Sequence, residues 1–160
     1  MSSLPPIPAG VVTLDDHETR ARTTLDANAW AYLAGGAANE LTVRANADAW
    51  HDLQLLPRVL RPLAGGHTRG TLLGRELAHP ILLAPVAYQR LAHPDGEIAS
   101  ALAASALQAG LVLSAQSSTP LEDVARAFGN DPARGPLWFQ LYLQPDRGFN
   151  RELVQRVEAA

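Results

Sequence analysis

Three short apolar runs mark the second half of the chain, and each is followed by a segment of helical character. The runs cover residues 81–84, 111–114 and 137–143, and each follows a proline or a glycine. Because they are too short for helices, we interpret each run as a buried strand. Their starts are roughly 30 residues apart, which is the length of one βα unit, so the pattern predicts a parallel sheet buried on both faces.

Helix signals fill the intervals between these runs. Pro94 suits a first helical position and Glu97 suits the positive end of the helix dipole, which predicts a helix over residues 94–110 that Gly110 ends. Further helices are expected over residues 120–128 and from residue 151, with Asn150 as the candidate cap.

The N-terminal part carries helix signals without an apolar core of its own. Helices are expected up to residue 25, where Asp15 or Asp16 is the candidate cap, and over residues 28–34 and 39–50; Gly35 and Gly36 end the second. Short strands are expected over residues 53–56 and 71–74. The predicted organisation is an extended arm (1–14), a helical lead-in (15–52), an irregular stretch (53–78) and βα units (79–160), the last three forming one domain.

Two α/β architectures fit this alternation of strands and helices, a doubly wound sheet and a (β/α)8 barrel. A barrel takes about 250 residues and eight strands. The 160 residues of this chain contain three such strand–helix repeats, and three strands cannot close a barrel. If the fold is a barrel, the chain is therefore expected to be the N-terminal part of a longer protein.

Composition narrows the chemistry that the chain can perform alone. It has no cysteine, and all 13 basic residues are arginine, which excludes disulfides, zinc–thiolate sites and Schiff-base lysines. The net charge of −3 does not indicate the basic surface that a nucleic-acid-binding protein needs. The five histidines lack helical metal-binding spacing. The N-terminus is not a secretory signal and no apolar run could span a bilayer, so we expect a soluble, cytoplasmic protein without a metal.

Polar side chains follow the predicted strands at their carboxyl ends, where α/β folds bind ligands. Alternation places Gln140 and Tyr142 on one face of their strand. They could hydrogen-bond a planar heterocycle or a carboxylate, or Gln140 could pair with a neighbouring loop while Tyr142 caps the core. Ser114, like the serines at 117 and 118, suits either a ligand contact or ordinary turn chemistry. His93 is interpreted as a turn-ordering residue.

The motifs themselves are recognisable when they are taken together. They are Tyr32-Leu33-Ala34-Gly35-Gly36, Pro57-Arg58-Val59-Leu60, Ala84-Pro85-Val86-Ala87, His93-Pro94-Asp95-Gly96-Glu97 and Trp138-Phe139-Gln140-Leu141-Tyr142. In this order and spacing the chain resembles the FMN-dependent α-hydroxy-acid oxidases and dehydrogenases, which include glycolate oxidase, lactate oxidase and flavocytochrome lactate dehydrogenase. The resemblance implies the N-terminal part of a (β/α)8 barrel with about three βα units.

The resemblance also implies roles for particular residues. Backbone at Pro85, Val86 and Ala87 would lie against the flavin ring of FMN, and the side chains of Ser114 and Gln140 would hydrogen-bond its polar edge. The substrate-binding residues would be Tyr32, for the substrate carboxylate, and Tyr142, for the reacting side of the substrate. The implied assembly of the intact enzyme is a homo-oligomer, a tetramer in the family.

The chain departs from the family in ways that matter for catalysis. The family's catalytic histidine base, its arginine for the carboxylate and its flavin-side lysine have no counterpart in residues 1–160. Gln116 stands where the plant glycolate oxidases have an aromatic residue. We therefore expect oxidation of a small (S)-2-hydroxy acid, such as lactate or glycolate, by a longer enzyme, and no activity from this chain alone. The alternatives are an inactive remnant or assembly module, and a different flavin barrel such as an isopentenyl diphosphate isomerase.

Overall fold

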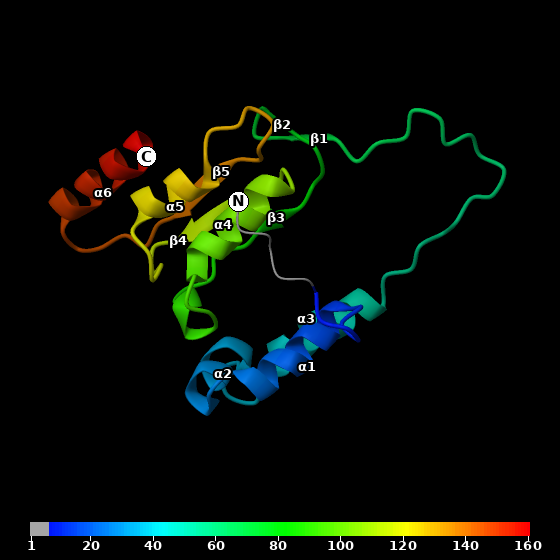
Figure 1. The fold of residues 1–160 in the computed structure, drawn as a ribbon, viewed down its shortest axis with the longest axis horizontal. Coiled ribbons are helices and arrows are strands. Elements are labelled where there is room, and N and C mark those ends of the chain that lie inside the picture. The colour runs from blue at the N-terminus through cyan, green and yellow to red at the C-terminus, as the bar shows by residue number, and fades with distance from the viewer. Residues whose placement is uncertain (1–6) are drawn as a thin grey trace. The chain divides into compact units, whose positions relative to one another are not determined.

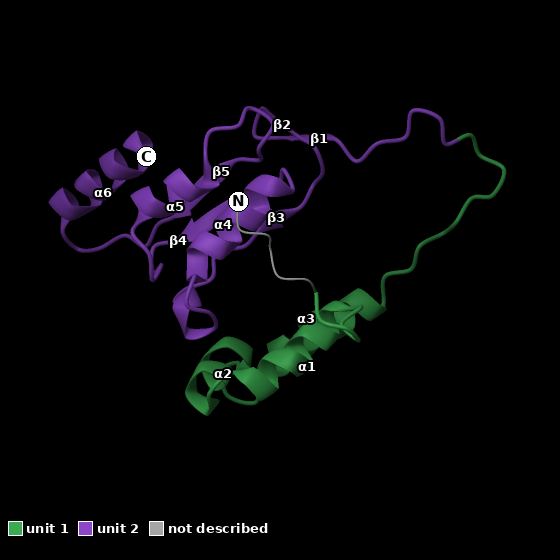
Figure 2. Ribbon diagram, viewed as in Figure 1, with its two compact units in different colours: residues 1–62 green, residues 63–160 purple. Residues whose placement is uncertain are grey.

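The computed structural model describes residues 7–160 and divides the chain into two compact units. One unit comprises residues 1–62 and the other comprises residues 63–160 (Figure 2). Residues 1–6 of the predicted extended arm lie outside the described part of the chain.

Three helices form the first unit: α1 (Leu14–Thr24), α2 (Ala27–Ala34) and α3 (Leu41–His51). The cap of α1 is Thr13, not Asp15 or Asp16 as predicted, because Asp16 is the third helical residue and closes a capping box with Thr13. Gly35 ends α2 as predicted. The third helix starts two residues later than predicted, since Glu40 has a left-handed backbone with φ of 56°.

A two-stranded antiparallel ribbon opens the second unit, formed by β1 (Gly70–Leu72) and β2 (Arg75–Leu77). The strand predicted over residues 71–74 is confirmed for residues 71 and 72. Its second half is wrong, because Leu73 and Gly74 have φ of 50° and 77° and make the turn between β1 and β2. The strand predicted over residues 53–56 is also wrong: that stretch is irregular and exposed.

The three predicted parallel strands are present as β3 (Leu82–Leu83), β4 (Gly110–Ser114) and β5 (Leu137–Gln140). The third strand ends three residues before the predicted end at residue 143, so Tyr142 lies in the loop after β5 and does not share a strand face with Gln140 as predicted. They form one sheet in the order β3-β4-β5, with both neighbouring pairs parallel (Figure 1). The interpretation of the first run as a buried strand is wrong for this chain, since Ile81 is 61% exposed and Leu83 38% exposed. The strand β3 lies at an edge of the sheet, and only the central strand β4 is well covered.

The helices that follow the strands are α4 (Gly96–Ala106), α5 (Leu121–Phe128) and α6 (Arg147–Ala159), with a short 3₁₀ turn, η1 (Gln89–Leu91), before α4. Both predicted boundaries of α4 are wrong, and so is the predicted start of α6. Pro94 precedes α4, and Gly110 is the first residue of β4 rather than the end of the helix. The cap of α6 is Asp146, whose carboxylate accepts from the amides of the first turn, so this helix begins one turn before the predicted Asn150 cap.

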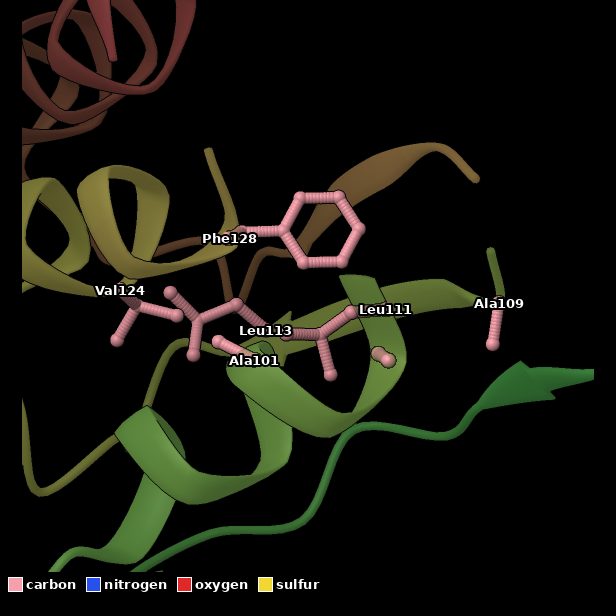
Figure 3. Packing of buried hydrophobic residues seen from close by; sticks show 7 residues of the cluster. Ala101, Ala109, Leu111, Leu113, Val124 and Phe128 are labelled. Atoms are coloured by element: carbon pink, nitrogen blue, oxygen red, sulfur yellow. The ribbon is translucent and has the colours of Figure 1, made fainter. Parts of the chain in front are cut away.

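The core of the second unit lies between the sheet and the helices α4 and α5. Figure 3 shows Val124 and Phe128 of α5 and Ala101 of α4 against Leu111 and Leu113 of β4. Leu137 and Phe139 of β5 pack on the same cluster. Because alternate residues of a strand face opposite ways, the residues at even positions of β4 and β5 lie on the other face of the sheet.

Candidate functional site

The side chains of Ser114 and Gln140 meet at the carboxyl ends of two neighbouring strands. They are the last residues of β4 and β5 and are partners in the parallel register. The Ser114 hydroxyl donates to Oε1 of Gln140 at 3.4 Å, and the amide of Ala115 donates to the same oxygen at 3.4 Å. Both contacts are long for hydrogen bonds, so these polar groups can exchange them for a stronger partner.

The predicted contact segment, residues 85–87, lies in the loop that follows β3. Val86 is exposed and Ala87 is half-buried. The next residue, Tyr88, has a left-handed backbone with φ of 52°, a conformation that costs a bulky residue about 1–3 kcal/mol. The Tyr88 amide donates to the carbonyl of Gln116 at 3.0 Å. This bond joins the loop after β3 to the loop after β4.

Tyr142 and Gln116 line one open hollow of about 660 Å³ at the same end of the sheet. The hollow is bordered by the loops after β4 and β5 and by the start of α6, through Ala115, Gln144, Pro145, Asp146, Phe149 and Leu153. Tyr142 is 56% exposed. The ring and hydroxyl of Tyr142 can therefore reach a small molecule placed beyond the strand ends.

Tyr32, the remaining predicted site residue, belongs to the first unit. It lies on α2, and half of its surface is exposed. Its helix is capped at the other end by Asp26, whose carboxylate accepts from the amides of Asn28 and Ala29 at 2.9 and 3.0 Å.

The serines at 117 and 118 serve the turn between β4 and α5. The Ser117 hydroxyl donates to the carbonyl of Thr119 and accepts from its amide, and Ser118 Oγ accepts from the amide of Arg90 at 3.3 Å. His93 accepts the amide of Asp95 on Nδ1 at 3.2 Å, so its predicted turn-ordering role is confirmed.

Sequence reasoning missed the role of Glu97, which it treated only as a helix-dipole residue. Its side chain is 1% exposed and is the one charged group among the buried residues of the described chain. Burial raises the pKa of Glu97, but hydrogen bonds from the Ser118 amide, its own amide and the Thr119 hydroxyl outweigh burial and hold the pKa below its ordinary value. A carboxylate at this position is therefore ionised at neutral pH. The one available sequence signal was its place next to Gly96, in the turn that follows Pro94.

These groups provide hydrogen-bond donors and acceptors without any metal ligand set. Within residues 7–160, no three histidine or carboxylate side chains stand close enough together to hold a metal ion. Over the same residues, no helix has both the length and the apolar character needed to cross a membrane. The hydrogen-bonded pair Ser114 and Gln140, the partly exposed residues 85–87 and the open hollow fit a planar, polar-edged heterocycle beside a small substrate.

Comparison with known proteins identifies a family and several relatives of this chain. The sequence model of the family described as FMN-dependent dehydrogenase matches residues 21–160. The chain is 52% identical to an L-lactate oxidase of Alicycliphilus denitrificans over 160 residues, which is 100% of this chain and 42% of the relative. It is 40% identical to a 4-hydroxymandelate oxidase of Amycolatopsis orientalis over 93% of this chain and 40% of the relative.

Solved structures agree with the sequence comparison. A crystal structure of mandelate oxidase with (S)-2-phenylpropionate superposes with a TM-score of 0.83 at 39% identity, covering 92% of this chain and 42% of the other. A mandelate oxidase variant whose structure holds a C4a-OH-FMN adduct superposes with a TM-score of 0.80 at 38% identity. The predicted fold class, the first βα units of a barrel behind a helical lead-in, is confirmed. The chain spans about two fifths of the length of the relatives that it matches.

Proposed function

Because the chain belongs to the family of FMN-dependent dehydrogenases, we propose that it is the N-terminal part of an enzyme that oxidises a small (S)-2-hydroxy acid, such as lactate or glycolate, to the 2-oxo acid. The main support for this proposal is the hydrogen-bonded pair that Ser114 and Gln140 form at the carboxyl ends of β4 and β5. A hydroxyl and a carboxamide on adjacent strand ends match the alternating donors and acceptors on the edge of a flavin ring.

In this proposal each site residue has a separate task. Ser114 and Gln140 hold the polar edge of the flavin and so fix its orientation, while the backbone of residues 85–87 lies against the ring. When bound, FMN supplies the redox chemistry by accepting two electrons from the substrate. Tyr142 donates a hydrogen bond to the reacting side of the substrate, and Tyr32 holds the substrate carboxylate.

The proton chemistry requires groups that residues 1–160 do not provide. A base must take the hydroxyl proton while the α-carbon loses its hydrogen, and a positioned base is worth typically 10²- to 10⁴-fold in rate. By resemblance to the family, that base is a histidine on a later strand. We therefore propose that residues 1–160 alone are inactive, and that the complete enzyme works as a cytoplasmic homo-oligomer, a tetramer by resemblance.

The direct test is turnover by the complete protein that contains this chain. The purified protein is expected to show the flavin absorption spectrum and to lose it on reaction with L-lactate or glycolate in the absence of other oxidants. A protein that binds FMN but is not reduced by any 2-hydroxy acid would contradict the proposed reaction and favour a different flavin enzyme.

Two substitutions in the complete protein test the separate roles of Gln140 and Tyr142. Gln140→Leu is expected to raise the FMN dissociation constant about tenfold by removing a hydrogen-bonding side chain from the ring edge. Tyr142→Phe is expected to leave FMN binding unchanged and to lower kcat/KM about 10-fold or more. Gln155→Leu on the exposed side of α6 is the control. An equal loss of FMN binding in the Gln155 variant would mean that the Gln140 effect is not local.

A further inference from the structure

The buried carboxylate of Glu97 joins two loops that are distant in the sequence. Its Oε1 accepts from the amide of Gln89 at 3.2 Å and from the amide of Ser118 at 2.7 Å, and its Oε2 accepts from the hydroxyl of Thr119 at 2.9 Å. Gln89 lies in the loop between β3 and α4, and the other two donors lie in the loop between β4 and α5. One carboxylate therefore holds the two strand-end loops at a fixed separation.

A chain of contacts leads from Glu97 back to the segment of residues 85–87. Gln89, whose amide Glu97 accepts, donates through Nε2 to the carbonyl of Val86 at 3.4 Å. The Gln89 side chain is itself held, because Ser100 Oγ donates to its Oε1 at 2.6 Å. The amide of Gln89 is two residues beyond Ala87, so the position of Glu97 sets the position of the loop backbone on both sides of Tyr88.

The loop between β3 and α4 needs these hydrogen bonds because its backbone is strained. Tyr88 has a left-handed φ of 52°, and such conformations persist where the surrounding structure over-determines them. Gly96, which precedes Glu97, has φ of 45°, and a Cβ there would stand 2.8 Å from Cγ of Arg90. Arg90 and the backbone of Gln89 are thus packed closely against the start of α4, where only glycine fits.

The donors around Glu97 favour a carboxylate over a neutral side chain at this position. Two backbone amides and one hydroxyl converge on Glu97, and hydrogen bonds to an ionised acceptor are about twice as strong as those between neutral groups. Removal of the acceptor would leave two backbone amides without a partner inside the protein. Hydrogen bonds that serve only stability could lie anywhere in the unit. Those of Glu97 join the two loops that flank the proposed site of the flavin ring.

We propose that Glu97 is a positioning residue for the flavin: it holds the loop after β3 so that the backbone of residues 85–87 stands at a fixed place against the ring. This inference rests on the proposed function. Glu97 touches neither substrate nor cofactor, and its effect passes through Gln89 and the backbone of residues 85–88. It should therefore tune cofactor affinity and reduction potential more than substrate affinity.

The experiment uses the complete holoenzyme and compares Glu97→Gln with Glu122→Gln. Glutamine retains the volume of Glu97 and an acceptor for the backbone amides but loses the charge. Glu122 is a half-buried glutamate on α5 that pairs with Arg156 at 2.8 Å, so it controls for the loss of one negative charge. The measurements are the FMN dissociation constant of the apoenzyme, the flavin reduction potential, kcat and KM, and hydrogen–deuterium exchange over residues 85–92.

The expected result is a local change that is confined to the Glu97 variant. Exchange over residues 85–92 should accelerate in the apoenzyme, the FMN dissociation constant should rise about 10- to 100-fold, the potential should shift, and kcat should fall while KM stays within a few-fold. Glu122→Gln should match the unaltered enzyme in all of these. If Glu97→Gln does not yield folded protein, Thr119→Val removes only the Oε2 bond and should show the same changes at smaller size.

The inference is overturned if Glu97→Gln lowers the melting temperature while FMN affinity, potential and loop exchange remain unchanged. That outcome would give Glu97 a purely structural role. The proposed function fails independently, and visibly, if the unaltered holoenzyme is not reduced by any 2-hydroxy acid. Because loop exchange is measured without FMN, the behaviour of Glu97 can still be read in that case.

Discussion

Residues 7–62 and residues 63–160 differ in how far they bury apolar side chains. Among the described residues of the first region, Ala29 is the only buried one, and Trp50 is 75% exposed. In the second region Val124 and Phe128 are completely buried against β4. The helices of the first region therefore depend more on local signals, such as the side-chain caps of α1 and α2, whereas the elements of the second depend on packing between residues far apart in the sequence.

The largest expected effect tests the packed core against the exposed helices. Phe128→Ala in the complete protein should lower the free energy of unfolding by about 3–5 kcal/mol, because Phe128 has no exposed surface. Trp50→Ala should change it by less than about 0.5 kcal/mol if the exposure of α3 is maintained. Urea denaturation measures both. A loss of several kcal/mol at Trp50 would contradict the comparison and mean that α3 is covered in the complete protein.

Two glycines test the same contrast through close backbone approach. A Cβ at Gly135 would stand 2.4 Å from backbone atoms of Ala109 and Gly110, whereas a Cβ at Gly36 would stand 2.4 Å from a side-chain atom of Val43. Because backbone gives way less than a side chain, Gly135→Ala should cost about 1–3 kcal/mol and Gly36→Ala less. Thermal denaturation of the two variants shows which one loses more stability. Equal losses of stability would mean that α3 is held as rigidly as β4.

The cap of α2 should have a smaller and more local effect. Asp26→Ala removes the acceptor for two helix amides and should cost about 1 kcal/mol. Faster hydrogen exchange is expected over residues 27–34, with little change in the melting temperature of the whole protein. Glu18→Ala, on the exposed surface of α1, is the control. A large drop in melting temperature with Asp26→Ala would show that the first unit unfolds together with the second.

The smallest effect is a dependence on pH that belongs to the second region. The folded pKa of Glu97 lies below its ordinary value of 4.5, so near and below that pH the unfolded chain binds more protons than the native chain. The stability that Glu97 contributes is fully present above about pH 5 and is lost as the pH falls through the folded pKa. Denaturation of Glu97→Gln should therefore show a shallower loss of stability below pH 4.5 than the unaltered protein; identical slopes would contradict the lowered pKa.

Much of the second region could be predicted from its sequence because strand length and helix signals are local. The start of β5 at Leu137 and the span of α5 agree with the predictions. The exposed edge at Ile81 could not be predicted, since burial of a strand depends on its neighbours in the sheet. Thr13 was missed as a cap because it competes with two following aspartates, and only the observed capping box decides among them.

In the candidate site, too, some features could be predicted from the sequence and others could not. The apolar run placed Ser114 at a strand end and alternation placed Gln140 on one face of its strand, but their pairing follows from a register that no local signal specifies. Glu97 could not be recognised from its sequence position as a buried acceptor, because its three donors come from two separate loops. The assignment of Tyr32 to the substrate rests on the resemblance and stays a prediction.

The parallel register of β4 and β5 has a consequence for anyone who recombines this chain with its relatives. Shifting β5 by a single residue would turn Gln140 to the opposite face and present Leu141 in its place. Residues 129–133 between α5 and β5 are exposed and lie outside the core, so insertions or crossover points there should be tolerated. The buried residues Gly135 and Pro136 should not be used as a junction, because Gly135 lies against the backbone of Ala109 and Gly110 at the start of β4.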